Sequence, residues 1–383
     1  MGNNWRIRKF SDLCEISRGS SPRPINDWLS ETGIPWLKIA DATKSNSRFV
    51  KETKQFIKDD DSFKGVRVFP GDLVLTNSAT PGLPKIIDFE GCIHDGWLLF
   101  RDFQNLDKLF AYYLLLYERR RIVQKASGTV FSNLKIDILR NHEILLPPLP
   151  EQRAIAGVLS ALDDKIDLLH RQNETLEALA QTLFRQWFVE EAEDDWEVGV
   201  IPDEFDFTMG LSPPGTSYNE EAIGTPMFQG NADFTFRFPR RRVFTTDPRR
   251  FAEKFDTLIS VRAPVGAQNM ALERCCIGRG VAAFRYKRNS QYFSYTYNKL
   301  NSIMAEIRQF EDSGTVFGSI NKSDFESLEI IIPPTELVDK FEYEVSPLDE
   351  KIYRNCLQIR TLEKLRDMLL PKLMSGEVRV VRS

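Results

Sequence analysis

Basic side chains crowd two separate stretches of this 383-residue chain, and clusters of this kind can contact phosphate groups. They are Lys38, Lys44, Arg48, Lys51, Lys54 and Lys58 in the first stretch and Arg237, Arg240, Arg241, Arg242, Arg249, Arg250 and Lys254 in the second. The net charge of −4 neither favours nor excludes a polyanionic partner, because such binding depends on the local surface. The run from Arg240 to Arg242 is therefore predicted to contact phosphate, which gives affinity and salt dependence without sequence choice.

Catalytic signatures are missing from the sequence. It contains no GxxxxGK[ST] phosphate loop, no glycine-rich turn of the dinucleotide-binding type and no Asn-Pro-Pro-Tyr-like adenine methylation motif. Three histidines, and five cysteines without a CxxC pair, argue against a metal site built on these residues. Scattered carboxylates leave no compact signature, so a nuclease centre of Asp, Glu and Lys stays open as an alternative. Asp59-Asp60-Asp61 is interpreted as a solvated turn. We therefore predict no catalytic residue and no metal ligand.

The composition is that of a soluble globular protein, at 42% hydrophobic and 28% charged residues. No apolar run approaches the ~20 residues of a membrane span. The segment Met1–Arg6 lacks the apolar stretch of a signal peptide. An odd set of cysteines is typical of free thiols in a reducing compartment. We therefore predict a cytoplasmic protein, without a membrane partner, that holds about two to three domains.

The elements that would position these side chains occur twice. Three segments recur 186 residues later (314 − 128 = 186): Gly128-Thr129-Val130-Phe131 as Gly314-Thr315-Val316-Phe317, Glu143–Pro148 as Glu329–Pro334, and Leu162–Ile166 as Leu348–Ile352. Different sequence precedes each copy. Because an internal repeat constrains the whole fold, this layout predicts two variable modules on a shared, internally symmetric frame.

The sequence in front of each repeat reads as a mixed α/β module. In the first module, strands are predicted at 34–39, 72–76, 97–100 and 142–146, and a helix at 106–125. The second module echoes the first: Gly33-Ile34-Pro35-Trp36 resembles Gly224-Thr225-Pro226-Met227, Asp72-Leu73-Val74-Leu75 resembles Asp256-Thr257-Leu258-Ile259, and Gly91-Cys92-Ile93 resembles Cys275-Cys276-Ile277. One fold is therefore predicted to be used twice.

Each module is followed by a heptad tract, which is the pattern of a coiled-coil seam. The seam positions are Ile155, Leu159, Leu162, Ile166, Leu169, Asn173, Leu176, Ala180, Leu183 and Trp187, and Phe341, Val345, Leu348, Ile352, Asn355, Ile359, Leu362, Arg366, Leu369 and Leu373. If a two-fold axis relates the repeats, the helices run antiparallel. The register then pairs Asn173 with Asn355, and one buried amide facing another would fix that register.

Prolines in the second tract predict interruptions, and acidic residues in both tracts suggest helix caps. Pro347 and Pro371 lie inside the second tract, and a helix start at Pro347 with Ser346 as N-cap is plausible. The acidic pairs in Asp163-Asp164-Lys165 and Asp349-Glu350-Lys351 are interpreted as helix caps and solvent-facing residues.

The chain resembles the specificity (S) subunit of type I restriction–modification systems. The residues that carry the resemblance are Leu145–Ile155, Leu162–Ile166, Ser260–Gly266, Gly314–Phe317, Ile332-Pro333-Pro334 and Leu369–Glu377. The resemblance implies an α/β fold with two target recognition domains, 1–150 and 193–336. Two spacer helices, 151–192 and 337–383, would pack as an antiparallel coiled coil with pseudo-two-fold symmetry.

The resemblance also implies a role in which this chain supplies an address and no chemistry. Each domain would read one half of a bipartite target in double-stranded DNA. The helices would set the spacing and dock two methyltransferase (M) subunits, and restriction (R) subunits would join them. S-adenosylmethionine, ATP and Mg are expected on those partners, with no cofactor on this chain. Two alternatives stay open: a DNA endonuclease with a cryptic acidic metal site, and a helical scaffold without sequence-specific DNA binding.

Side chains that can read base edges are amides, hydroxyls, Arg and Lys. The candidates in loops beside basic residues are Thr76, Asn77, Ser78, Lys85, Ser132, Asn133 and Lys135 in the first module, and Arg240, Arg241, Arg242, Arg262, Gln268, Asn269, Ser319, Asn321 and Lys322 in the second. Trp36, Phe131 and Phe317 are interpreted as core residues and not as base-stacking groups.

Overall fold

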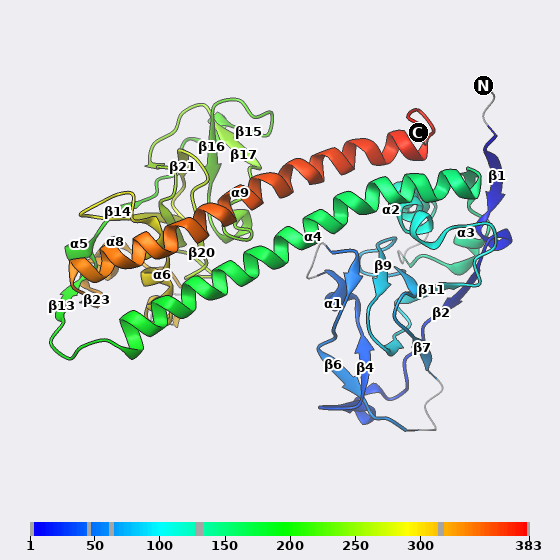
Figure 1. Cartoon of the computed structure of the whole chain (residues 1–383), viewed down its shortest axis with the longest axis horizontal. Helices are drawn as coiled ribbons and strands as arrows, with labels where there is room; N and C mark the ends of the chain where they lie inside the picture. Colours follow the sequence, from blue (N-terminus) through cyan, green and yellow to red (C-terminus); the bar gives the residue numbers. More distant parts are fainter. Residues whose placement is uncertain (1–3, 44–46, 61–64, 127–132, 313–317, 381–383) are drawn as a thin grey trace. The chain divides into compact units, whose positions relative to one another are not determined.

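The computed structural model describes residues 4–43, 47–60, 65–126, 133–312 and 318–380 (Figure 1). The chain folds into two compact units. Unit 1 comprises Met1–Leu168 and Ile359–Ser383, and unit 2 comprises Leu169–Gln358. The long helices α4 (Leu149–Arg185) and α9 (Thr335–Met374) each contribute one segment to each unit. Each unit therefore combines one α/β module with a pair of helical segments.

The described residues of unit 1 form three β-sheets. Strands β1 (Arg6–Lys9) and β12 (Glu143–Leu146) form an antiparallel pair. A five-stranded sheet has the order β2 (Glu15–Arg18), β11 (Trp97–Arg101), β8 (Leu73–Thr76), β9 (Pro84–Ile87), β5 (Phe49–Val50). A second has the order β3 (Leu29–Ser30), β6 (Gln55–Ile57), β4 (Ile34–Leu37), β10 (Gly91–Ile93), β7 (Val66–Val68). Helices α1 (Ile39–Thr43), α2 (Lys108–Ala126) and α3 (Ile136–Arg140) complete the module. The strands and the helix predicted for this module are confirmed with small shifts of their ends.

Unit 2 repeats this topology among its described residues, except that its first sheet lacks a counterpart of β5. Strands β13 (Glu197–Val200) and β23 (Glu329–Ile332) form the antiparallel pair. One sheet has the order β14 (Phe205–Met209), β22 (Val281–Tyr286), β19 (Thr257–Ser260), β20 (Gln268–Met270). The other has the order β15 (Tyr218–Asn219), β17 (Val243–Thr245), β16 (Thr225–Phe228), β21 (Cys275–Ile277), β18 (Phe251–Ala252). Its helices are α5 (Ile201–Glu204), α6 (Phe293–Ser302), α7 (Met304–Asp312) and α8 (Lys322–Ser327).

The two modules correspond residue by residue at their shared features. Cys92 of β10 pairs in parallel with Trp36 of β4, and Cys276 of β21 pairs in parallel with Met227 of β16. Both pairings join strands that the sequence echoes had matched. The predicted duplication of one fold is therefore confirmed, and Trp36 is a core residue, as predicted, at 1% exposure.

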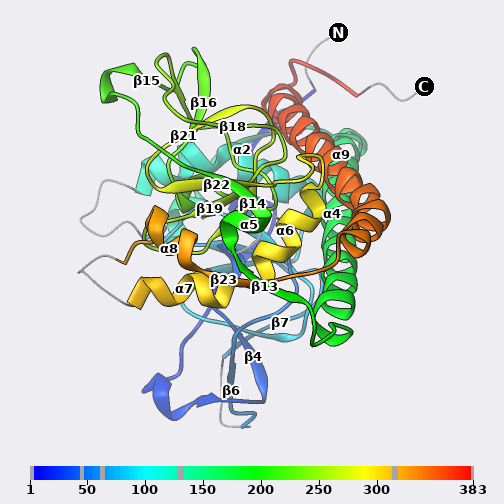
Figure 2. The ribbon, with the colours of Figure 1, turned by 90° about the vertical axis from the view of Figure 1, so that its left-hand side faces the viewer.

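The core of unit 2 lies between a sheet and the long helices, and α6 runs through this layer (Figure 2). The Tyr295 ring packs edge-on against Tyr286 of β22, with ring centroids 5.4 Å apart, and against Phe341 of α9 at 6.4 Å. Phe184 of α4 belongs to the same core cluster. Burial of these large aromatic side chains stabilises the attachment of the module to both helical segments.

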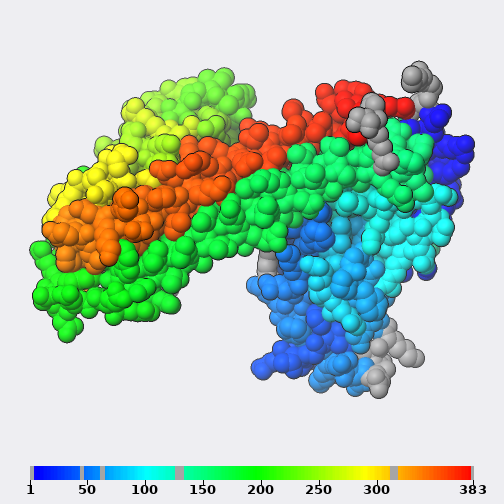
Figure 3. All heavy atoms as spheres, in the orientation of Figure 1, coloured from blue at the N-terminus to red at the C-terminus, as the bar shows by residue number. Residues whose placement is uncertain are grey.

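The α4 and α9 segments lie side by side within each unit (Figure 3). In unit 1 Arg366 donates to Asp163, and in unit 2 Asn355 donates to Asn173. Residue numbers rise along α4 while those of their partners fall along α9, so the helices are antiparallel. This arrangement agrees with the predicted coiled coil.

Neither proline interrupts α9, which runs without a break from Thr335 to Met374. The prediction of a helix start at Pro347 is therefore wrong. A proline inside a helix removes one backbone hydrogen bond and crowds the preceding turn. Val345 and Leu348, on either side of Pro347, pack into the core cluster of unit 2, and this burial keeps the helix continuous. Helix α4 is also continuous and ends in a π-helical turn, Gln186–Glu190.

Candidate nucleic-acid interface

A clamped loop follows the same strand in each unit. After β8, the Thr76 hydroxyl donates to the carbonyl of Thr80 at 2.5 Å and accepts from the Leu83 amide at 2.9 Å. After β19, the Ser260 hydroxyl donates to the carbonyl of Pro264 at 2.7 Å and accepts from the amide of residue 267 at 2.8 Å. A hydroxyl-bearing side chain at the strand end thus holds both loops in one shape. The loops at 77–83 and 261–267 are equivalent.

A second segment pairs with each loop. The Leu134 amide donates to the carbonyl of Asn77 at 2.8 Å, and the Ile320 amide donates to the carbonyl of Val261 at 3.1 Å. Leu134 and Ile320 are 186 residues apart (320 − 134), so the repeat supplies this second segment. A β-bridge between Arg262 and Ser319 extends the contact in unit 2. Each unit therefore presents one edge made of a clamped loop and a repeated segment.

The repeated segment of unit 2 is ordered by its own capping interactions. Asn321 is the N-cap of α8, and its side chain accepts from the amides of Ser323 and Asp324. Its exposed neighbour Lys322 forms an ion pair of 2.7 Å with Glu326 on the same helix. The Asn321 amide oxygen is therefore engaged in capping, whereas the Lys322 side chain lies on the surface.

Most of the candidate residues are accessible. Exposed residues are Asn133, Lys135, Arg240, Arg241, Arg242, Arg262, Ser319, Asn321 and Lys322, and half-buried residues are Ser78 and Gln268. Gln268 uses its amide nitrogen to donate to the carbonyl of Tyr297 at 2.7 Å. Ser132, Phe131 and Phe317 lie outside the described residues.

Four candidates are buried, so the prediction that their side chains lie on a DNA-accessible surface is wrong. Thr76 is clamped as described above, Asn77 donates to the carbonyl of Asp95 at 2.9 Å, Lys85 to that of Ser47 at 2.5 Å, and Asn269 to that of Thr235 at 2.6 Å. Their exposure is at most 4%. Burial lowers the pKa of the Lys85 amine to about 8, against the opposing effect of Asp167. These polar side chains satisfy backbone groups inside the fold, as buried polar groups do.

The basic stretches divide into surface and interior residues. Arg241 forms an ion pair of 2.5 Å with Glu273, and Arg242 forms one of 2.9 Å with Asp233, while both stay about half exposed. Arg48 and Arg237 are buried, at 7% and 3% exposure. Clustering in the sequence therefore does not place every arginine on a phosphate-accessible surface.

Sequence reasoning missed two arginines beside the loops. Arg119 of α2 donates to the carbonyl of Pro81 at 3.2 Å, and the exposed Arg308 of α7 donates to that of Gly266 at 3.2 Å. A shallow cavity of about 440 Å³, lined by Pro81, Leu116, Tyr117, Arg119, Arg120 and Val123, opens beside the first loop. The signal available in the sequence was the run of three arginines at 119–121.

The acidic motifs at 163–165 and 349–351 were also misassigned. Asp163 is 8% exposed and Asp349 is 3% exposed, and each accepts from an arginine, Arg366 and Arg237 respectively. The prediction that these residues are caps or solvent-facing is therefore wrong for both aspartates. Their partners lie more than a hundred residues away in the sequence, so local spacing could not reveal them.

A duplicated module with an exposed polar loop edge, joined to a pair of antiparallel helices, defines a class of two-module recognition proteins. The model of the type I restriction modification DNA specificity domain matches residues 2–178 and again residues 194–344. The chain therefore belongs to this family and carries its domain twice.

Relatives match over nearly the whole chain. A protein of Methanocaldococcus jannaschii with the provisional name type I restriction enzyme MjaX specificity subunit is 29% identical, covering 98% of this chain and 94% of that protein. The type I restriction enzyme MjaIX specificity subunit of the same organism is 26% identical over the same shares. The solved S subunit of a type I restriction-modification system from M. genitalium is 19% identical, with a TM-score of 0.64, covering 100% of this chain and 98% of that one. This structural likeness supports the fold.

No group of three or more His, Cys, Asp or Glu side chains among the described residues is arranged to hold a metal ion. None of the described helices combines the length and apolar character needed to cross a membrane.

Proposed function

We propose that this chain is the DNA-recognition subunit of a type I restriction–modification complex. Each module reads one half of a bipartite target in double-stranded DNA. The observation that carries this proposal is the repeated loop edge, which has one backbone design and two different sets of side chains. Ser78 in the first loop corresponds to Arg262 in the second, and Asn133 corresponds to Ser319. A common scaffold with divergent hydrogen-bonding groups is suited to reading two different sequences.

The helices supply spacing and docking in this proposal. Helix α4 has 37 residues and α9 has 40, so a straight helix of this length spans roughly 55–60 Å. One turn of DNA is shorter, at ~34–36 Å. The repeated helical segments offer two equivalent surfaces for two methyltransferase (M) subunits, and restriction (R) subunits complete the complex in the cytoplasm.

Catalysis belongs to the partners in this proposal. Those subunits bring S-adenosylmethionine, ATP and Mg, and this chain brings the address. A purified chain should therefore bind DNA without cutting it. Metal-dependent cleavage by the chain alone would favour the endonuclease alternative, and binding without sequence preference would favour the scaffold alternative.

The test is to define the methylated sequence with the partner subunits present and then to exchange one module. Replacement of 1–150 by the corresponding module of a relative should change one half-site and leave the other intact. A change in both half-sites would contradict the assignment of one reader to each half.

A point variant sharpens the same test. Arg262→Ala should reduce discrimination at one position of one half-site by about 1–3 kcal/mol. Arg354→Ala is the matched control, because Arg354 is exposed and pairs only along α9 with Glu350 among the described residues. It removes the same charge and should leave the sequence preference unchanged. Equal effects of the two variants would contradict base reading by Arg262.

A further inference from the structure

Each module contains a buried arginine at an equivalent place. The Ile86 amide of β9 donates to the carbonyl of Arg48 at 2.8 Å, and the Met270 amide of β20 donates to the carbonyl of Arg237 at 2.8 Å. Strands β9 and β20 occupy the same position, next to β8 and β19. Arg48 and Arg237 therefore correspond in the duplicated fold, although they are 189 residues apart and not 186 (237 − 48).

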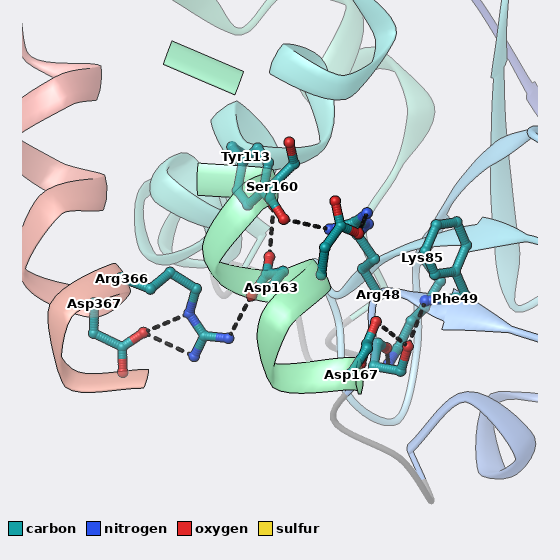
Figure 4. Close-up of polar contacts among 11 residues, drawn as sticks. Arg48, Phe49, Lys85, Tyr113, Ser160, Asp163, Asp167, Arg366 and Asp367 are labelled. Carbon is teal, nitrogen blue, oxygen red and sulfur yellow. Dashed lines mark hydrogen bonds and ion pairs between the residues drawn. The ribbon is translucent and has the colours of Figure 1, made fainter. Parts of the chain in front are cut away.

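Both arginines reach from the module to the repeated acidic motif on the long helices. In unit 1, Arg48 forms an ion pair with Asp164 of α4 and donates to the carbonyl of Ser160 at 3.4 Å (Figure 4). In unit 2, Arg237 forms an ion pair with Asp349 of α9. Asp164 is the third residue of the Leu162–Ile166 motif and Asp349 is the second residue of its copy, so the two arginines bind adjacent positions of the repeated motif. The motif thus receives one arginine from each module.

Further contacts surround Arg237. In unit 2, Arg237 also contacts Glu177 of α4 at 3.4 Å and lies 3.6 Å from the centroid of the Tyr297 ring. Arg237 therefore connects the module to both helical segments of its unit.

In unit 1 the same surface of α4 carries two more polar contacts. The Tyr113 hydroxyl of α2 donates to Asp163 at 2.6 Å, and Ser47 donates to Asp167 at 3.2 Å. The module is therefore held to α4 by directional contacts at several successive turns (Figure 4).

These contacts are better suited to fixing an orientation than to adding stability. Arg237 and Asp349 are both buried, and burying an ion pair removes both charges from water, so the net gain is small compared with a well-packed apolar pair and the best-attested benefit is a defined register. In unit 1 only Arg48 is buried, because the Asp164 side chain is 62% exposed, and an ion pair with one partner in water also adds little stability. The backbone of Arg237 has a φ of +61°, a region that side-chain-bearing residues seldom occupy. This backbone conformation costs energy, and the contacts that the Arg237 side chain makes with Asp349 and Glu177 offset that cost. The direction of the side chain therefore matters for the attachment of the module.

We propose that Arg48 and Arg237 are positioning residues that lock each reading module onto the long helices in one orientation. Through that lock they restrict binding to DNA targets with one spacer length between the half-sites. This inference rests on the proposed function, because a spacer exists only if the target is bipartite. The recognised bases are set by the loop edges and are independent of the lock.

The test uses the assembled complex and duplexes whose half-sites are separated by the wild-type spacer or by one base pair more or fewer. The double variant Arg237→Met with Asp349→Leu removes the polar lock and keeps an apolar contact of similar size. It should lower the discrimination between correct and altered spacers by about tenfold while the preference for the half-site bases is kept. A variant that is merely less stable would lose active protein in equal measure for every duplex.

Two further variants make the result decisive. Asp164→Asn tests the lock of unit 1 at a side chain that is 62% exposed, so folding should survive the change. It should relax spacer choice in the same direction. Glu350→Gln, next to Asp349, is the matched control, because Glu350 is exposed and pairs along its own helix with Arg354; it should retain the wild-type profile.

The outcomes separate the two proposals. A wild-type complex that shows no preference for any bipartite target would overturn the proposed function. A wild-type complex with a sharp spacer optimum, together with lock variants that keep the same optimum and the same sharpness, would overturn this inference alone.

Discussion

The pair Asn173 and Asn355 offers a quantitative test of how α4 and α9 find their register. Both side chains are buried, at 0% and 1% exposure. Asn355 donates through Nδ2 to Asn173 Oδ1 at 2.8 Å and to Gln172 Oε1 at 2.9 Å. Asn173 donates in turn to the sulfur of Cys356 at 3.5 Å. The perturbation is replacement of either amide, or of both, by leucine.

The contacts predict unequal costs for the two single variants. Asn173→Leu removes one acceptor from Asn355 but leaves it the oxygen of Gln172, so a loss of about 1 kcal/mol is expected. Asn355→Leu leaves the Asn173 carbonyl without its donor in a buried site, which costs about 1–3 kcal/mol. In the double variant no buried amide is left unpaired, and two leucines extend the apolar seam. The double variant should therefore be more stable than either single variant.

Urea unfolding monitored through unit 2 measures the free energy of unfolding of the wild type, the two single variants and the double variant. Glu174→Gln is the control, because Glu174 is exposed on the adjacent position of α4. The control should change the free energy of unfolding by less than about 0.5 kcal/mol. Additive losses in the double variant would refute the reasoning, since they would show that the two amides do not interact. The double variant should also discriminate less between targets with different spacer lengths, because the amide pair no longer fixes the register.

Two further predictions concern stability. Burial raises the pKa of Glu342 from 4.5 to about 7, although it accepts the backbone amides of Tyr295 and Ser294. The folded state then holds the Glu342 carboxyl proton more tightly than the unfolded state, so the free energy of unfolding should fall by ~3 kcal/mol as pH rises from about 4.5 to about 7. In Glu342→Gln, urea unfolding across that pH range should lose this dependence on pH. The same dependence in the variant as in the wild type would contradict the assignment. Gly33→Ala should lower the stability of unit 1 by about 1–3 kcal/mol in thermal unfolding. The reason is that Gly33 has a φ of +125° and a Cβ there would lie 2.4 Å from the Ile57 carbonyl oxygen. A variant with the wild-type Tm would contradict this prediction.

The parts of the fold that the sequence could predict depend on local periodicity or on exact repetition. The antiparallel helices and the meeting of Asn173 with Asn355 followed from heptad spacing, since an amide in an apolar seam has few other partners. The duplication of the modules followed from short strand echoes such as Gly33–Trp36 and Gly224–Met227. Both copies of this echo begin at a glycine with positive φ, and that backbone requirement keeps the signal visible.

The parts that the sequence could not predict depend on contacts between distant segments. Pro347 was expected to start a helix, but packing of the flanking seam residues overrides the local preference. Thr76 and Lys85 were expected on a DNA-facing edge, but they satisfy backbone carbonyls inside the module. A polar side chain near a turn has the same local sequence signature whether its partner is a base or a carbonyl of the same chain.

The spacing between equivalent residues shows where the two modules have diverged. It is 191 residues for Gly33 and Gly224, 189 for Arg48 and Arg237, 184 for Thr76 and Ser260, and again 186 for Leu134 and Ile320. Insertions and deletions therefore fall within the modules, while the frame after them keeps a constant offset. Loops tolerate such changes because they cross the surface and carry few buried contacts. Arg48 and Arg237 lie in the part of the modules where the offset varies, yet each contacts a copy of the Leu162–Ile166 motif on the helices, where the offset stays at 186. Attachment of the modules to the frame has thus been retained while the sequence between the attachment points has changed, as a chain that must read different DNA from one fixed geometry requires.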